Sequence, residues 1–172
     1  MIGKLQGIVD YIGDGFIILL VHGVGYRVFT AEYLTHKSTV ELWIETVVRE
    51  DSIRLFGFST LQSQDLFNML TGVSGVGPKV ALAIMGTIKS DTLISAIATG
   101  DAKTIATAPG VGKKMAEKII VELKNKVGGA SATLFAPDTS VSKSSALSDL
   151  LMALESLGYR RLDIIEMAQK LV

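Results

Sequence analysis

The 172-residue sequence contains no cysteine and only two histidines, His22 and His36. A chain without cysteine forms no disulfide, no thiolate metal site and no cysteine nucleophile. Two imidazoles are too few for most zinc sites and proton relays. We therefore expect a function in which this chain binds no metal and no cofactor.

Long hydrophobic runs are also lacking. The longest strongly apolar run covers residues 16–21, far short of the roughly 20 residues that span a bilayer. Residues 1–4 lead into no signal-peptide pattern. Hydrophobic residues nevertheless make up 48% of the chain and charged residues 20%, which is typical of a folded globular protein. The expected location is the cytoplasm, with no membrane contact.

Neither sign of charge predominates, because 17 basic side chains balance 17 acidic ones. The balance is uneven along the chain. Residues 1–61 hold five Lys/Arg and seven Asp/Glu, residues 62–128 hold eight Lys and five acids, and residues 129–172 hold four basic and five acidic side chains. A basic middle between acidic ends is what a segment-specific anion site would produce, although the margin is small.

The first 61 residues have the pattern of a small β-barrel. Short stretches rich in β-branched and aromatic residues alternate with glycine-containing turns. Several short strands with a turn about every 8–12 residues are typical of sandwiches and barrels. The sequence predicts five or six strands, among them residues 4–11, 16–21, 26–29, 39–48 and 52–58.

Residues 62–127 change to a helical period. Apolar residues recur at helical spacing through this segment, and residues 115–127 predict a longer helix with lysines at its C-terminal end. Ser90 and Asp101 are candidate helix N-caps. The segment is therefore predicted to be an all-α domain.

The remaining residues differ from both segments. Residues 128–143 are small and polar, which is typical of a flexible linker. Residues 144–172 predict two short amphipathic helices with too little core to be stable alone. The predicted fold class is multidomain α+β, with an N-terminal barrel, a central all-α domain and a small C-terminal helical domain.

One motif occurs twice in the helical segment, 35 residues apart. Residues 70–81 read LTGVSGVGPKVA and residues 105–116 read IATAPGVGKKMA. Each copy runs from a helix through Gly-Val-Gly into the next helix, which has a lysine in its first turn. The paired glycines allow positive φ and a close approach of another backbone, and the valine between them can anchor the turn in the core.

The first turn of a helix offers unpaired N–H groups and the positive end of the helix dipole. Pro78 suits this position, where no N–H is missed. Lys79 and Lys114 are unfavourable there unless an anion is present, so the pattern fits a phosphate group. An ordinary tight turn explains one copy equally well, but two copies with matching lysines favour binding. A nucleotide P-loop does not fit, because Lys114 and Thr107 stand where that motif has Ser/Thr and Gly.

These turns resemble helix-hairpin-helix motifs, which contact DNA phosphates without reading bases. Together with MIGKLQG at 1–7, GVGY at 23–26 and VVREDSIRLFGF at 47–58, the pair resembles the RuvA family, the Holliday-junction-binding subunits of the bacterial branch-migration complex. The resemblance implies an oligonucleotide-binding (OB) type barrel over residues 1–61 and a tandem helix-hairpin-helix domain over residues 62–127. It also implies a C-terminal domain that is mobile on its linker.

The family further implies a subunit without catalysis of its own, which holds a four-way junction open as a homotetramer or a pair of tetramers. ATP would be used by the hexameric motor RuvB, so that the chain is part of an ATP-dependent helicase complex. A RuvC-type junction resolvase is a further implied partner. The implied processes are homologous recombination, DNA repair and the SOS response in the bacterial cytoplasm.

The resemblance also implies roles for residues that match the family's motifs. Glu50 and Asp51 match an acidic pin at the tetramer centre, where eight carboxylates would repel phosphates and separate strands. Taken alone, the same pair is typical of a solvated turn. The implied DNA-binding residues are Gly75, Val76, Gly77, Lys79, Gly110, Val111, Gly112, Lys113, Lys114 and Lys118.

The C-terminal segment departs from the family. The similarity continues only weakly through residues 157–159, and the family's three C-terminal helices are represented by two before Val172. Docking of the motor here is therefore in doubt, and the apolar positions are equally explained as the small domain's own core. They are Leu150, Leu154, Leu157, Ile164, Ile165 and Met167.

Two other classes of function fit the sequence less well. A repair nuclease or glycosylase would need a carboxylate cluster or a Lys/Asp pair beside the DNA. Asp91 and Asp101 are the only acids between the hairpins, and both are better explained as helix N-terminal residues. A single-strand-binding barrel would need exposed aromatic platforms, and aromatics make up only 6% of the chain. A junction-binding protein is favoured.

Overall fold

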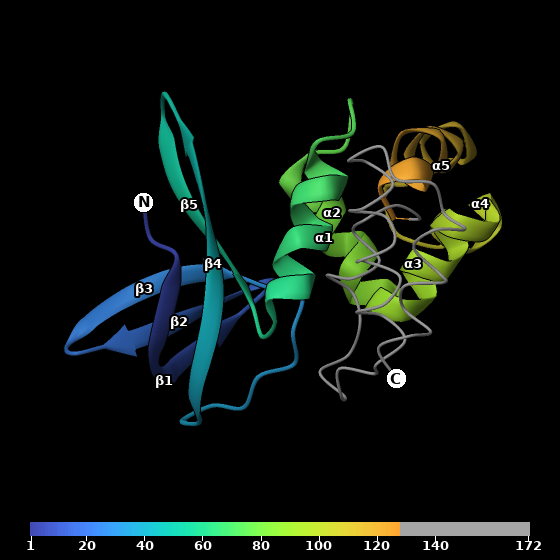
Figure 1. Ribbon diagram of the computed structural model, residues 1–172. Helices are drawn as coiled ribbons and strands as arrows, with labels where there is room; N and C mark the ends of the chain where they lie inside the picture. Colours follow the sequence, from blue (N-terminus) through green and yellow to red (C-terminus); the bar gives the residue numbers. More distant parts are fainter. Residues whose placement is uncertain (128–172) are drawn as a thin grey trace, which may run out of the picture. The chain divides into compact units, whose positions relative to one another are not determined.

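The computed structural model describes residues 1–127, which lie within one compact unit (Figure 1). Residues 128–172, which include the predicted linker and C-terminal helices, lie outside the described residues. The strands are β1 (Lys4–Gly13), β2 (Phe16–Val21), β3 (Val24–Phe29), β4 (Thr39–Arg49) and β5 (Ser52–Phe58). The helices are α1 (Leu61–Thr71), α2 (Pro78–Thr87), α3 (Ser90–Thr99), α4 (Ala102–Ile105) and α5 (Lys113–Val127).

The strands close into a barrel in the order β1-β2-β3-β5-β4. All neighbouring strands are antiparallel except β3 and β5, which run parallel. Because successive side chains of a strand point to opposite faces, every second residue enters the interior. The predicted barrel is confirmed, with five strands. Its buried core consists of Val9, Ile17, Leu19, Val28, Leu42, Ile44 and Leu55.

Two glycines let the barrel strands approach one another. A Cβ on Gly57 would lie 2.5 Å from a side-chain carbon of Val28, and a Cβ on Gly7 would lie 2.4 Å from the carbonyl oxygen of Leu20. Neither separation is possible for real atoms. Any side chain at these two positions would therefore push neighbouring strands apart.

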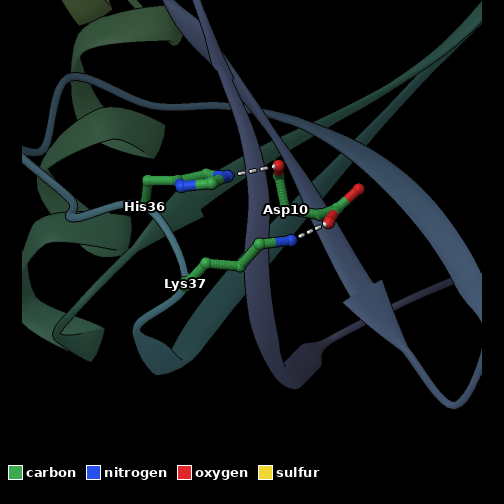
Figure 2. A network of polar contacts seen from close by, with 3 residues as sticks. All are labelled: Asp10, His36 and Lys37. Carbon is green, nitrogen blue, oxygen red and sulfur yellow. Dashed lines mark hydrogen bonds and ion pairs between the residues drawn. The ribbon is translucent and has the colours of Figure 1, made fainter.

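The loop between β3 and β4 is fastened to β1 at Asp10 (Figure 2). The ammonium group of Lys37 donates to Asp10 Oδ1 at 2.6 Å, and the Nε2 atom of His36 hydrogen-bonds to the Asp10 carbonyl oxygen at 2.9 Å. The backbone N–H of Lys37 donates to the Val9 carbonyl at 2.7 Å. These bonds lie beside the irregularity in the β1–β2 pairing between Val9 and Tyr11, and they hold the loop against the barrel.

The helical segment begins directly after the barrel. Thr60 caps α1 by accepting from the Ser63 N–H, and Asp101 caps α4 by accepting from the N–H groups of Lys103 and Thr104. The prediction of Asp101 as an N-cap is confirmed. The prediction of Ser90 is wrong by one position: Lys89 is the N-cap of α3, its side chain makes no capping bond, and Ser90 is the first helical residue.

The barrel and the helices share apolar contacts. Phe56 and Phe58 of β5 both pack against Phe67 of α1, with ring centroids 5.0 Å apart in each pair. These side chains continue into the core between the helices, which includes Leu70, Ile84, Leu93 and Ile119. No single helix within residues 1–127 is long and apolar enough to cross a membrane, and α2 with α3 passes that test only as a pair bent by 102°.

Candidate nucleic-acid interface

The two copies of the repeated motif adopt the same turn. Gly75 has φ of 94° and Gly110 has φ of 81°, so the first glycine of each pair occupies the left-handed region that favours glycine. In the first turn the Val76 N–H donates to the Val73 carbonyl at 2.9 Å. In the second turn the Val111 N–H donates to the Ala108 carbonyl at 3.1 Å. The second glycine of each pair does not have a positive φ.

Burial repeats with the same 35-residue period. Val76 is 4% exposed and Val111 is 6% exposed, so each valine anchors its turn in the core as predicted. Other buried side chains recur at the same spacing on the helices before and after each turn. The matching pairs are Leu70 with Ile105, Val73 with Ala108, Ala81 with Ala116, and Ile84 with Ile119.

The glycines themselves face outward. Gly75, Gly77, Gly110 and Gly112 are exposed, and no atom lies within 4 Å of the position that a Cβ on any of them would take. The core therefore does not require glycine for space at these positions. What the turns present to solvent is bare backbone, immediately before the start of a helix.

Each turn runs directly into a helix whose first N–H groups are free. Pro78 lies in the first turn of α2, as the sequence predicted, and Gly77 is the N-cap. The first intrahelical bond runs from the Ala81 N–H to the Gly77 carbonyl at 3.0 Å, and the matching bond runs from Ala116 to Gly112 at 3.0 Å. Neither helix has an acidic residue in its first turn, so its positive end is uncompensated within the described chain.

Three lysines, Lys79, Lys113 and Lys114, lie on the first turns of α2 and α5, and Lys118 lies one turn farther along α5. Lys79 and Lys114 are exposed and form no ion pair with another residue in the described part of the chain. Lys113 lies 4.0 Å from Glu117 and Lys118 lies 3.9 Å from Glu122, which are long, exposed i,i+4 pairs. Such pairs contribute little, so all four ammonium groups are available to a solvent anion.

Glu50 and Asp51 form the turn between β4 and β5, and both are exposed. The last paired residues below them are Arg49 and Ser52, and the Ser52 hydroxyl donates to Asp51 Oδ1 at 3.2 Å. The tip of this hairpin stands clear of the other strands (Figure 1). The structure therefore places the predicted acidic pin, Glu50 with Asp51, at a projecting and solvated position.

Sequence reasoning did not find a groove of about 830 Å³ that lies between the barrel and α2. Its walls include Arg49 and Arg54 from the β4–β5 hairpin and Gly77 and Lys79 from the first repeated turn. We call it the barrel groove. The observed pairing of β4 with β5 places both arginines on one face of the hairpin, and no pattern in the sequence indicated that α2 would lie opposite them.

Asp91 and Asp101, the two acids between the hairpins, both line a small cleft between α3 and α4. Asp91 is in the first turn of α3, and Asp101 accepts hydrogen bonds from two backbone N–H groups and from Thr104 Oγ1. Within residues 1–127 no three His, Cys, Asp or Glu side chains gather as metal ligands would. The proposed motor-binding residues at 150–167 lie outside the described residues.

The described segments match two protein families. Residues 1–57 match the RuvA N terminal domain, and residues 67–125 match the SAM-like helix-hairpin-helix tandem. A Holliday junction branch migration complex subunit RuvA from Xanthobacter autotrophicus is 45% identical over 170 residues, which covers 92% of this chain and 83% of that protein. The protein of the same name from Brucella canis is 44% identical over 172 residues, which covers 94% and 84% respectively.

Proposed function

Because the chain belongs to the RuvA family, we propose that it is a non-catalytic, structure-specific DNA-binding subunit. Its substrate is the four-way Holliday junction, which it holds open for branch migration during recombination and DNA repair. Curated relatives from two genera carry the name of such a subunit, and the two segments that bear the candidate site each match a family domain.

The observation that carries the proposal is the pair of repeated turns. Each presents exposed glycine backbone, free helix N–H groups and one lysine without an ion pair among the described residues, all on one short stretch of chain. These groups suit phosphate oxygens and contain nothing that reads a base edge. Two copies on one rigid core can hold a DNA backbone at two points, which selects for DNA shape and not for sequence.

Assembly is part of the same proposal. The acidic pin acts on DNA only if four copies bring it to a common centre, and we infer a homotetramer for that reason. The words "complex subunit" in the relatives' names support a partner. We assign that role to a RuvB-type ATPase that consumes the ATP, with a RuvC-type resolvase acting on the same junction in the cytoplasm.

A direct test measures the affinity of the purified chain for a four-way junction, a duplex and a single strand at one salt concentration. The junction should bind most tightly, because only it offers four backbones in the arrangement that a four-fold assembly presents. Preference for the single strand would instead support a single-strand-binding barrel. Cleavage of any of the three DNAs would support a nuclease.

The contribution of the turns is tested with Lys79→Ala and Lys114→Ala. Each variant should lose one phosphate contact. The negative slope of log K against log salt should therefore become shallower by about 0.9. Lys89→Ala is the matched control, since Lys89 is an exposed cation just beyond the far end of α2. An unchanged slope in both turn variants would remove the phosphate assignment.

A further inference from the structure

We propose that the barrel groove binds a further stretch of DNA backbone and leads it from the first repeated turn to the acidic pin. Arg49 and Arg54 of the barrel would hold the phosphates of this stretch. The inference rests on the proposed function, since it concerns the same DNA. It adds a binding surface on the barrel that neither the hairpin motif nor the family resemblance assigned.

The pairing of β4 with β5 directs both arginines into the groove. Arg54 lies opposite Val47, and Ser52 lies opposite Arg49. Because alternate residues share a face of a strand, Arg49 and Arg54 point to the same side of the hairpin. Diagonal neighbours of this kind are about 7–8 Å apart, so both guanidinium groups can reach one strand of DNA.

The cations of the groove form no ion pair within the described part of the chain. Arg49, Arg54 and Lys79 form no ion pair with another residue among residues 1–127, whereas Lys4 and Lys37 on the barrel surface do. Asp14 is the single acidic residue among the described residues that line the groove. Three unpaired cations facing one carboxylate create a positive potential that favours an anionic occupant.

The floor of the groove is apolar. Phe29 and Phe56 contribute from the barrel and Val80 and Ala83 from α2, and the Arg54 guanidinium lies 6.0 Å from the centre of the Phe29 ring. A sugar–phosphate backbone offers both apolar sugar edges and charged phosphates, so it matches this floor and these walls. An apolar protein segment would fit the floor but would leave three cations covered and unpaired, which is costly.

The groove also connects the two features of the proposed site. Gly77 and Lys79 belong to the first repeated turn, and Pro109 directly precedes Gly110 of the second. At the other end Arg49 is the residue before Glu50. A strand held by the two arginines would therefore be attracted along the hairpin and then meet the carboxylates at its tip, which set the point where the backbone must turn away.

The test uses the full chain and three single variants, Arg49→Gln, Arg54→Gln and Arg27→Gln. Arg27 is the matched control: its guanidinium also lies over a phenylalanine ring, 4.8 Å from the centre of Phe16, but it does not line the groove. Junction affinity is measured across a series of salt concentrations, and the mass of the free assembly is measured by sedimentation. In each of the two groove variants the negative slope of log K against log salt should become shallower by about 0.9, and the assembly mass should stay unchanged. Arg27→Gln should change neither the slope nor the mass.

The outcomes separate this inference from the proposed function. If the unmodified chain shows no preference for the junction, the proposed function fails first. If that preference holds but the slopes of Arg49→Gln and Arg54→Gln equal that of the unmodified chain, only the groove inference is overturned. It is equally overturned if Arg27→Gln lowers the slope as much, or if the groove variants change the assembly mass, which would identify the groove as a contact between protein chains.

Discussion

At the scale of single residues, Gly75 and Gly110 carry most of the argument for a binding surface. Their positive φ angles exclude most side chains on backbone grounds, while the space around them is open. An added methyl group therefore costs only the backbone strain of the left-handed region, about 1–2 kcal/mol. Any larger effect on DNA binding must come from what approaches the turn from outside.

Gly100 provides a matched comparison for Gly110. Gly100 ends α3 with φ of 82°, close to the 81° of Gly110, and a Cβ would also meet no atom within 4 Å. Gly100→Ala and Gly110→Ala should lower the free energy of unfolding by similar amounts, measured by urea denaturation. Only Gly110→Ala should weaken junction binding, by tenfold or about 1.4 kcal/mol, because its methyl group would stand where a phosphate docks. If the two variants bound the junction with equal affinity, the repeated turn would only connect two helices and would not contact DNA.

At the scale of elements, the short helix α4 depends on its N-cap. It contains four residues, which is too short for a helix to be stable without tertiary contacts. Asp101 satisfies the N–H groups of Lys103 and Thr104, and Ile105 at the end of the helix is fully buried next to the second repeated turn. The cap therefore helps to position the backbone that enters Gly110.

The charge on Asp101 makes this element sensitive to acid. Hydrogen bonds from the Thr104 hydroxyl, and then from backbone N–H groups, hold the pKa of this carboxyl below its ordinary value. A pKa that is lower in the folded state contributes stability above the unfolded pKa and loses it as pH falls through the folded pKa. Asp101→Asn retains a capping oxygen but cannot titrate.

The unmodified chain should therefore be more stable than Asp101→Asn near neutral pH, and this difference should shrink as the pH falls through about 4 and below. Urea denaturation at a series of pH values measures the difference, and carboxyl NMR measures the pKa directly. Stability curves that stay parallel down to acid pH would show that the carboxylate charge does not support α4.

At the scale of the whole molecule, the acidic pin gains a role only through assembly. One copy places two carboxylates on a solvated hairpin tip, where they interact weakly with anything beyond a Debye length of about 8–10 Å. A four-fold arrangement would bring eight of them within that range of a single crossover. The proposed selectivity for junctions is thus a property of the assembly and not of the isolated chain.

Replacing both acids by their amides, Glu50→Gln with Asp51→Asn, should remove this repulsion and leave the barrel intact, since both lie in an exposed turn. Duplex DNA should then bind more tightly while junction binding holds, so the preference for the junction should fall. Glu41→Gln with Asp65→Asn removes the same charge from β4 and α1 and should leave the preference unchanged. The measurement is a paired titration of junction and duplex DNA at one salt concentration. If the Glu50→Gln/Asp51→Asn variant kept the preference of the unmodified chain, Glu50 and Asp51 would be an ordinary solvated turn.

The local features of this protein follow from the sequence alone. The Gly-Val-Gly spacing, the proline at the first position of α2 and the cap at Asp101 depend on residues within one or two turns of each other, so their conformations could be predicted. The error at Ser90 has a local cause as well. Lys89 takes the capping position without a capping side chain, so the strongest nearby capping residue is displaced into the helix.

Long-range packing determined the strand pairing, the closure of the barrel and the position of the barrel groove. The parallel pairing of β3 with β5 and the closure of the barrel join residues far apart in the chain, and no short pattern specifies such pairings. The register of β4 and β5 places Arg49 and Arg54 on one face of a hairpin. The packing of Phe56 and Phe58 against α1 joined that hairpin to the helical core. A Cβ on Gly86 of α2 would lie 3.3 Å from the Ala31 Cβ, so α2 passes close to the residues that follow β3. The groove exists because apolar burial fixes two distant elements against each other, and only then do three separate cations face the same space.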